Sequence, residues 1–414
     1  MGLSLLADKF REKMSKSKDM KMQEGQASIG YPTGFLNFDF LNGCISYGLN
    51  KQSGDRHKYY SVGISDGCMV MFIGRTACGK TTLAIQMAAN IIRPYKTSCI
   101  FHDDVEGGGS NYSRRKVLTK MSDEALEDRY IFRNSGVTLE NLYERIKAIH
   151  DLKIENREAF EYDTGMFDSF GNRIYKLEPS VYLLDSLAMV MPEKNLEEDE
   201  LSGQMSQTAA ARAIAATFRR VIPMLKTANI ILMVINHIGT KIQGMVKTKS
   251  DMSYLKLDET LPGGRTPLYL ANNLIRLDDT NLKASDSLGI DGKIITTTLC
   301  KTRSSQAGRT TKLVLDYDRG FDADLSMLLN MKEEGFLNGS GAFLYFGDRS
   351  DIKFSLRNFR EKLEANPELK DIFDQSTMEY VQTLITEVKQ EEIEQRESLD
   401  YISIVDRMNN LVAA

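Results

Sequence analysis

The sequence predicts an α/β fold in which a mostly parallel, twisted sheet is flanked by helices. From Ser28 to about Asp324, short apolar runs of β type alternate with helical patterns, as in βαβ units. Several runs, such as 68–74, 180–185 and 230–236, are apolar at consecutive positions, which is typical of strands covered on both faces. A glycine-rich motif follows the first of these runs and precedes a helical pattern.

Three segments are predicted along the 414 residues: a short N-terminal helix with its linker over 1–28, a core over 29–324, and a small α-rich C-terminal domain over 325–414. The first segment has apolar residues at helical spacing, at Leu3, Leu6, Phe10 and Met14. We expect this helix either to dock on a neighbouring subunit or to pack as an ordinary terminal helix. The last segment ends in an acid-rich stretch, which is consistent with a solvated helix.

The composition limits the classes of partner. The formal net charge is only −4, so nucleic-acid binding would have to come from local loops and not from a global basic field. The five cysteines form no CxxC pair, which favours reduced thiols that serve as small apolar residues. No apolar run approaches the roughly 20 residues of a membrane span, and no signal-peptide pattern is present. We therefore expect a cytoplasmic protein with no membrane partner.

The glycine-rich motif predicts a nucleotide site. The pattern GxxxxGK[ST] is fitted by Gly74, Arg75, Thr76, Ala77, Cys78, Gly79, Lys80 and Thr81, with Thr82 behind it. Glycines let main-chain N–H groups surround phosphate oxygens, and the following helix directs its positive end at the same anion. Lys80 would place a charge on the β- and γ-phosphates, and Thr81 a hydroxyl on Mg²⁺. ATP and Mg²⁺ are therefore the predicted cofactors.

Acidic residues at strand ends predict the other catalytic groups. The apolar run VYLLD ends at Asp185, in the form of a strand whose last carboxylate holds Mg²⁺. Segment 102–115 supplies acids followed by three glycines, and Glu106 is the candidate general base in it. Asp103 and Asp104 are its rivals, and a purely structural role is also open for them.

The order of these motifs resembles the RecA family of recombinases, most closely its phage-encoded members. The resemblance covers roughly residues 30–345 and implies a RecA-type P-loop core. Its markers, in chain order, are TGFLNFD (33–39), GRTACGKTT (74–82), DDVEGG (103–108), YLLDS (182–186), AAAR (209–212), MVINH (233–237), LPGG (261–264), CKTRS (300–304) and LDYDRG (315–320).

The resemblance implies catalytic and metal-binding roles for single residues. Lys80, Thr81 and Asp185 match the residues that bind Mg-ATP in the family, with Thr81 and Asp185 on the metal. Glu106 matches the catalytic glutamate. His237 follows Asn236 at the strand end where the family senses the γ-phosphate, although a histidine that is merely hydrogen-bonded there is the alternative.

The resemblance also implies contacts with the base and across a subunit interface. Tyr112 and Tyr317 match aromatic residues near the adenine. Lys301 and Arg303 match a pair of cations that reach the ATP bound by the adjacent protomer. Such a pair would make assembly depend on ATP, and hydrolysis depend on assembly. A solvated pair on a loop is the alternative.

Two long segments match the DNA-binding loops of the family. The first, about 192–206, is acidic, which is unexpected for a loop that binds phosphate. The second, about 238–264, is basic and longer than an ordinary connection. The DNA-binding candidates, which the resemblance or their chemistry selects, are Arg212, Arg219, Lys241, Met245, Lys247, Lys249, Gly263 and Gly264.

The function implied is that of a DNA-dependent ATPase that forms helical filaments of itself on single-stranded DNA and exchanges strands with double-stranded DNA in recombination and repair. Single-strand-binding and mediator proteins are further candidate partners. Two alternatives stay open: a hexameric helicase built on the same core, and a regulatory ATP-binding assembly protein with little DNA activity. The acidic segment 192–206 is the best support for the last of these.

Overall fold

The computed structural model describes Lys9 and residues 29–49, 56–107, 111–167, 173–193, 203–240, 254–256, 258–341 and 343–387. Apart from Lys9, the predicted N-terminal helix lies outside the described residues, as does most of the acid-rich end. No described helix is both long and apolar enough to cross a membrane.

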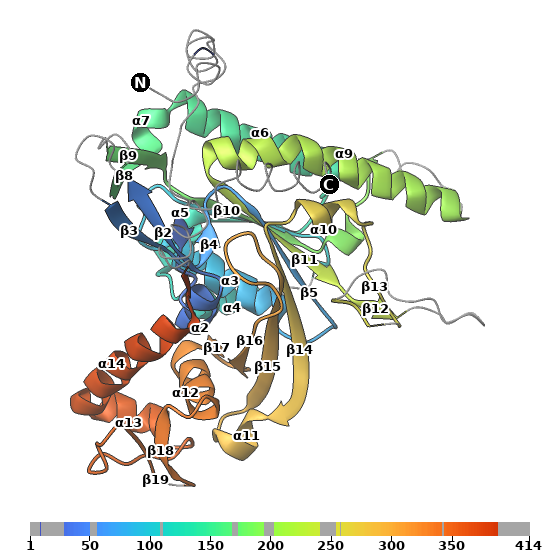
Figure 1. The fold of residues 1–414 in the computed structure, drawn as a ribbon. Helices are drawn as coiled ribbons and strands as arrows, with labels where there is room; N and C mark the ends of the chain where they lie inside the picture. Colours follow the sequence, from blue (N-terminus) through green and yellow to red (C-terminus); the bar gives the residue numbers. More distant parts are fainter. Residues whose placement is uncertain are drawn as a thin grey trace, which may run out of the picture.

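A nine-stranded sheet forms the centre of the chain (Figure 1). Its strands are β5 (Met69–Gly74), β6 (Ile100–Asp104), β7 (Tyr130–Arg133), β10 (Ser180–Asp185), β11 (Ile230–His237), β14 (Asn273–Lys283), β15 (Gly292–Lys301), β16 (Thr310–Asp316) and β17 (Gly320–Asp322). Their order is β17-β16-β15-β14-β5-β11-β10-β6-β7. The six strands from β14 to β7 run parallel, and β15, β16 and β17 continue the sheet as antiparallel neighbours. The predicted α/β fold with a mostly parallel sheet is confirmed.

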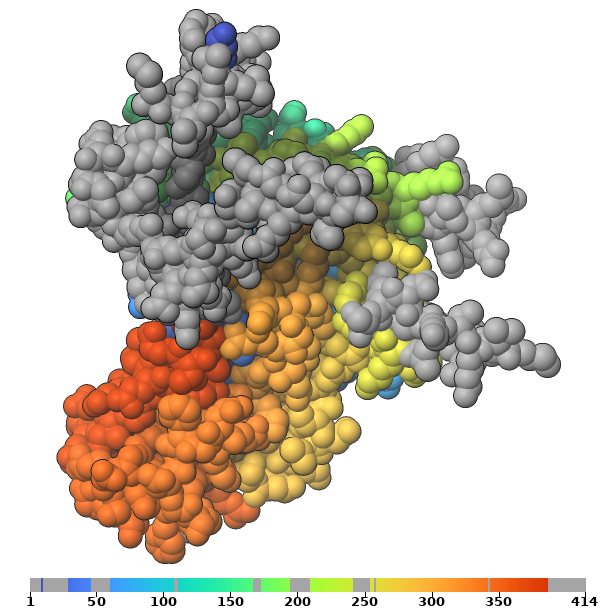
Figure 2. Space-filling model, viewed as in Figure 1, coloured from blue at the N-terminus to red at the C-terminus, as the bar shows by residue number. Residues whose placement is uncertain are grey.

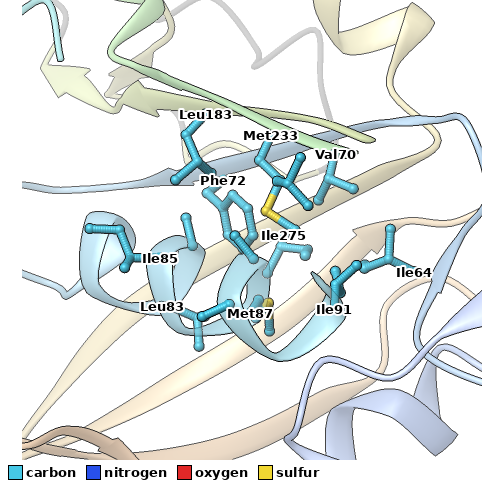
Figure 3. Close-up of a cluster of buried hydrophobic side chains, with 14 of the residues drawn as sticks. Ile64, Val70, Phe72, Leu83, Ile85, Met87, Ile91, Leu183, Met233 and Ile275 are labelled. Atoms are coloured by element: carbon cyan, nitrogen blue, oxygen red, sulfur yellow. The ribbon is translucent and has the colours of Figure 1, made fainter. Parts of the chain in front are cut away.

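Helices on both faces explain why the central strands are apolar at consecutive positions. Val70 and Phe72 of β5 pack under α3 (Lys80–Ile92), and Figure 3 shows them beside Leu83 and Met87 of that helix. Alternate residues of the same strand, such as Met71, join the cluster that contains α6 (Leu139–Glu155) and α9 (Gly203–Ala228). In Figure 1 these two helices lie side by side across one face of the sheet. The side chains of one strand thus supply two cores.

Capping residues fix where several helices begin. The side chains of Asn111, Ser122 and Thr138 accept hydrogen bonds from main-chain N–H groups in the first turns of α4 (Tyr112–Thr119), α5 (Asp123–Arg129) and α6, respectively. The shorter elements of the core are β1 (Gly30–Tyr31), α2 (Leu36–Leu41), β4 (Ile64–Ser65), α7 (Arg157–Phe160), β8 (Glu161–Phe167), β9 (Arg173–Leu177), β12 (Gly239–Thr240), β13 (Glu259–Thr260), α10 (Thr266–Leu270) and α11 (Ala284–Ser287).

The C-terminal lobe packs around a hydrophobic cluster that it shares with residues of the preceding chain, among them Phe40 of α2 and Val314 of β16. It contains α12 (Ala323–Glu333), β18 (Leu337–Ser340), β19 (Phe343–Phe346), α13 (Phe359–Ala365) and α14 (Pro367–Leu384). Figure 2 shows it in orange to red at the lower left. Its centre is a cluster of rings from Phe346, Phe354, Phe359 and Phe373. The predicted boundary at Asp324 falls in the first turn of α12, and the division into domains remains a prediction.

The described residues of segment 44–62, which has no counterpart among the motifs, include the two paired strands of a hairpin. Strand β2 (Cys44–Leu49) pairs antiparallel with β3 (Arg56–Ser61). On its other edge β2 pairs in parallel with β20 (Thr386–Glu387), which follows the C-terminal lobe. The last described strand of the chain therefore returns to one of the first.

Candidate nucleotide-binding site

The carboxyl ends of four parallel strands meet at one edge of the sheet. Asp185 of β10 is level with Asp104 of β6 on one side and with Ile235 of β11 on the other. His237 of β11 is level with Gly74, the last residue of β5. Residues that are far apart in the sequence are thereby gathered at one place, as expected for ligand sites of parallel sheets.

The glycine-rich motif forms a tight loop between β5 and α3. An added Cβ on Gly74 would lie 2.5 Å from the carbonyl oxygen of Leu277 and 2.7 Å from Sγ of Cys78, so only glycine fits there. Gly79 has a φ of +83° and stands at the N-cap of α3. Ala77 has a φ of +62°, which is uncommon for a residue with a side chain. These residues fix a tightly curled loop, and its binding of phosphate remains a prediction.

Lys80 is folded into its own loop. Its Nζ donates to the carbonyl oxygens of Gly74 at 3.1 Å and Arg75 at 2.8 Å. The residue is only 5% exposed, and burial lowers the pKa of its ammonium group. The ammonium group of Lys80 is therefore held inside the loop 74–79 by main-chain carbonyl oxygens.

Thr81 and Asp185 form a pair of oxygen ligands that fits Mg²⁺. The Thr81 hydroxyl donates to Oδ2 of Asp185 at 2.5 Å. Burial raises the pKa of Asp185 to about 6 against the effect of this hydrogen bond, and the nearby carboxylates of Glu106 and Asp104 raise it further. Among the described residues no group of three or more His, Cys, Asp and Glu could hold a metal. A bound Mg²⁺ would thus take its other oxygens from water and phosphate, which is its usual preference.

Glu106 lies beside this pair and is held by two polar side chains. Its Oε1 accepts the Ser186 hydroxyl at 2.6 Å and lies 2.7 Å from Nε2 of His237. Burial tends to raise the pKa of Glu106, but Ser186, His237 and Lys80 together bring it below its usual value. The carboxylate is 40% exposed and ionised at neutral pH, so it can accept a proton.

The two rival acids make contacts of a structural kind. Asp103 is fully buried and is paired with Arg145 of α6 and the Tyr182 hydroxyl. One oxygen of Asp104 accepts the N–H of Gly107 at 3.0 Å and so shapes the loop that carries Glu106. These contacts favour Glu106 as the base, and its assignment remains a prediction.

Sequence reasoning did not select Ser186, which binds the carboxylate of Glu106. Its only signal was its position, directly after the strand-terminal Asp185 in YLLDS. A hydroxyl at that position follows the strand end where the carboxylates gather, and so could have been considered.

The glycine pair of LPGG packs against α9 and the turn after β10. Both glycines have positive φ, +86° at Gly263 and +76° at Gly264. A Cβ on Gly263 would lie 3.1 Å from a methyl carbon of Leu187. The Asn236 amide donates to the carbonyl oxygen of Pro262 at 2.9 Å, which ties the end of β11 to this segment. The pair therefore has a packing reason to be glycine, in addition to the predicted contact with phosphate.

The two aromatic candidates are exposed and lie on neighbouring segments. Tyr112 at the start of α4 is 40% exposed, and Tyr317 in the turn between β16 and β17 is 44% exposed. Arg114 joins the segments by donating to the carbonyl oxygen of Tyr317 at 2.9 Å. Strand β17, which follows this turn, approaches the phosphate loop, because an added Cβ on Gly79 would lie 2.8 Å from the ring of Phe321. Their proximity agrees with the predicted adenine contacts, which remain untested.

Lys301 and Arg303 lie away from the phosphate loop of their own chain. Leu274 of β14 is level with both Lys301 of β15 and Met71 of β5. Lys301 is thus three residues, or roughly 10 Å along the strands, behind the level of Gly74. Arg303 follows in the direction away from the loop. The structure does not bring this cation pair to Lys80 within one chain.

The DNA-binding candidates are only partly described. Arg212 and Arg219 are both exposed on α9. Four further candidates lie outside the described residues: Lys241, Met245, Lys247 and Lys249. Their contact with DNA remains a prediction.

No protein-family model matches the chain. The chain is similar to RecA. RecA of Pseudomonas fluorescens is 23% identical to it over 337 residues, which are 81% of this chain and 83% of that protein. The likeness supports a RecA-like family for the chain. It does not distinguish phage-encoded members from bacterial ones, so that finer prediction remains a prediction.

Proposed function

We propose that the chain is a Mg²⁺-dependent, DNA-stimulated ATPase that assembles with ATP on single-stranded DNA and catalyses homologous pairing and strand exchange in recombination and repair. The observation that carries this proposal is the meeting of Lys80, Thr81, Asp185, Glu106 and His237 at one edge of the sheet. The two segments expected to bind DNA follow β10 and β11, which end at this edge. The likeness to RecA supports the same function.

The residues at this edge have complementary tasks in hydrolysis. Mg²⁺ on Thr81 and Asp185 would neutralise phosphate charge. Lys80 would leave its two loop carbonyls for phosphate oxygens, and the ionised Glu106 would accept the proton of the attacking water. Ser186 and His237 both contact Oε1 of Glu106, so Oε2 would receive the water while the two polar side chains hold the carboxylate in place.

His237 would connect the nucleotide with the segment that is predicted to bind DNA. It contacts Glu106 through Nε2, and its main-chain N–H donates to the side chain of Asn236 at 3.0 Å. Asn236 in turn holds the carbonyl of Pro262, near the end of segment 238–264. A change at His237 on phosphate binding would therefore be felt at both ends of the segment that is predicted to bind DNA.

Self-assembly would complete the site from a second copy. Lys301 and Arg303 are too far from the phosphate loop of their own chain and would act on the ATP of a neighbour.

An apolar cavity of about 350 Å³ lies beside β7, the edge strand of the sheet, and its lining includes Phe101, Ile131, Ile149, Leu152 and Phe160. We propose that it receives the apolar residues of segment 1–28 from the neighbouring copy. The substitution Leu152→Asp in the cavity should then shorten the assemblies.

Electron microscopy with single-stranded DNA, Mg²⁺ and a slowly hydrolysed ATP analogue tests the proposal. Continuous helical filaments that are absent with Lys80→Ala, together with strand exchange by the wild-type protein, are the expected result. Closed six-membered rings would instead favour the helicase, and no assembly on DNA would favour the regulatory ATP-binding protein.

A further inference from the structure

A threonine separates the two cations of the sequence Lys301-Thr302-Arg303, and its side chain has a different partner from theirs. Lys301 Nζ donates to the carbonyl oxygen of Tyr269, at the end of α10, at 2.7 Å, and Arg303 approaches the same oxygen at 3.5 Å. The Thr302 hydroxyl donates instead to Oδ1 of Asn42 at 2.9 Å. The side chain of Thr302 thus contacts Asn42, whereas the side chains of Lys301 and Arg303 contact the end of α10.

Asn42 is a fully buried junction between four parts of the chain. It follows α2, and its amide donates to the carbonyl oxygen of Gly63 at 2.7 Å. Its Oδ1 also accepts Asn273 Nδ2, at the start of β14, at 2.8 Å. The Ser304 hydroxyl donates to the main-chain oxygen of Asn42 at 2.8 Å. Because a buried amide that loses a partner is left unsatisfied, this set of bonds holds one geometry.

The junction holds both residues that flank Arg303. Within the described residues, the guanidinium of Arg303 makes a single hydrogen bond, the long one of 3.5 Å, which is weak. Its own contacts therefore do little to place it. Thr302 and Ser304 are bonded to Asn42 on either side and to each other, with Ser304 N donating to Thr302 Oγ1 at 3.1 Å. The position of the Arg303 main chain is set by this pair.

We propose that Asn42, acting through Thr302 and Ser304, is a positioning residue for the Lys301–Arg303 pair. The inference rests on the proposed function, in which the pair acts on ATP held by a neighbouring copy. Asn42 then governs how fast the neighbour hydrolyses ATP, and it leaves unchanged how tightly its own subunit binds nucleotide. If the hydrogen bonds of Asn42 only stabilised the fold, their loss would not lower the neighbour's rate of hydrolysis while leaving the subunit's own nucleotide affinity unchanged.

Two threonines of one region give a matched pair of variants. Thr302→Val removes the hydroxyl that binds Asn42. Thr297→Val is the control. Thr297 is a buried threonine of β15, the strand that leads to Thr302, and its hydroxyl has no hydrogen-bond partner among the described residues. Loss of one positioning hydrogen bond should lower the DNA-stimulated ATPase rate about 3- to 10-fold in Thr302→Val. Thr297→Val should stay within about twofold of wild type, and both should bind nucleotide without DNA as wild type does.

Mixed assemblies separate positioning from damage to the variant's own site. Glu106→Gln subunits are expected to bind ATP without hydrolysing it, and the substitution does not touch the Asn42 junction. Added to Thr302→Val subunits, they should restore turnover per Thr302→Val subunit, since they supply a correctly placed cation pair to its ATP. Absence of rescue would overturn the inference.

Lys301→Ala distinguishes failure of the inference from failure of the function on which it rests. If Lys301→Ala leaves the DNA-stimulated rate unchanged, the proposed role of the pair is wrong, and with it the inference. If Lys301→Ala lowers the rate but Thr302→Val and Ser304→Ala behave as Thr297→Val does, the positioning role of the junction alone is wrong.

Discussion

Lys80 and Lys301 are both held by main-chain carbonyls, but in different regions and at different depths. Lys80 lies inside the phosphate loop, on the carbonyls of Gly74 and Arg75, and is almost fully buried. Lys301 lies on the carbonyls of Leu268 and Tyr269 at the end of a short helix and is partly exposed. Burial lowers the pKa of both ammonium groups, and Arg303 adds to the effect at Lys301.

The difference indicates two directions of action. A lysine enclosed by its own loop can serve only a ligand that enters the loop. Lys301 is partly exposed, and the next residue, Thr302, is held by Asn42. Lys301 is therefore available to a ligand outside its own chain. The predictions below test whether the two cations divide the work in this way.

The largest effect is expected from Lys80→Ala. Removal of the cation inside the loop should weaken nucleotide binding by each isolated subunit and lower ATP hydrolysis by roughly 10³-fold or more. Nucleotide titration without DNA, followed by ATPase assays with DNA, measures both. The comparison would fail if Lys80→Ala bound nucleotide as tightly as wild type.

Glu106→Gln should separate binding from chemistry within the same region. Nucleotide affinity should change little, since Glu106 is not part of the phosphate loop. Hydrolysis should fall by about 10²- to 10⁴-fold because the general base is lost. Single-turnover ATPase measurements test this, with Glu124→Gln, the same substitution at an exposed acid of α5, as a control expected to resemble wild type.

Lys301→Ala should leave nucleotide binding by isolated subunits within about twofold of wild type. DNA-stimulated hydrolysis should nevertheless fall by on the order of 10²-fold, because a cation supplied across an interface is lost from the transition state. Weaker nucleotide binding by the isolated variant subunit would mean that Lys301 serves its own chain, and the contrast with Lys80 would disappear.

Lys153 is a further buried lysine, and it lies on α6 and not in the phosphate loop. Its Nζ donates to the carbonyl of Glu178 at 2.6 Å and to the Ser180 hydroxyl at 3.2 Å, and burial lowers its pKa to about 7. Since the folded pKa is below the unfolded value of 10.5, its stabilising contribution is present at high pH and is lost as pH falls toward 7. The free energy of unfolding should rise from pH 7 to 10 more steeply in wild type than in Lys153→Met, by at most about 1.4 kcal/mol per pH unit.

Urea titrations of both proteins at pH 7, 8, 9 and 10 measure this slope. Parallel curves would show that Lys153 stays charged in the folded protein over the whole range, and that burial does not lower its pKa.

Local patterns explain how much could be predicted from the sequence. The strand before Gly74 and the loop after it are encoded within a dozen residues. The meeting of Asp185 and Glu106 could be anticipated because parallel strands end at one edge. Contacts between distant segments carry no local signal: nothing near Asn42 indicates that it holds Thr302. The same holds for Asp103, whose pairing with Arg145 depends on how α6 packs on the sheet.

The position of the 44–62 hairpin was unpredictable for a related reason. Alternating residues indicated neither its partner nor its role, because β2 pairs with β20 at the far end of the chain. Lys301 and Arg303 could be matched to a family motif. Their distance from the phosphate loop along the strands, however, depends on the strand register. Register is set by the assembled sheet and not by the motif.

The strand order has a consequence for synthesis of the chain. Strand β5 pairs with β11 and β14, and both of them are translated long after it. The antiparallel strands β14 to β17, in contrast, pair with their immediate successors and can form as soon as they leave the ribosome. A nascent chain that has not reached β11 therefore exposes an unpaired, entirely apolar strand, Met69–Gly74, which is prone to aggregate. The strand that leads into the phosphate loop thus stays without its partner strands on the ribosome until β11 and β14 have been made.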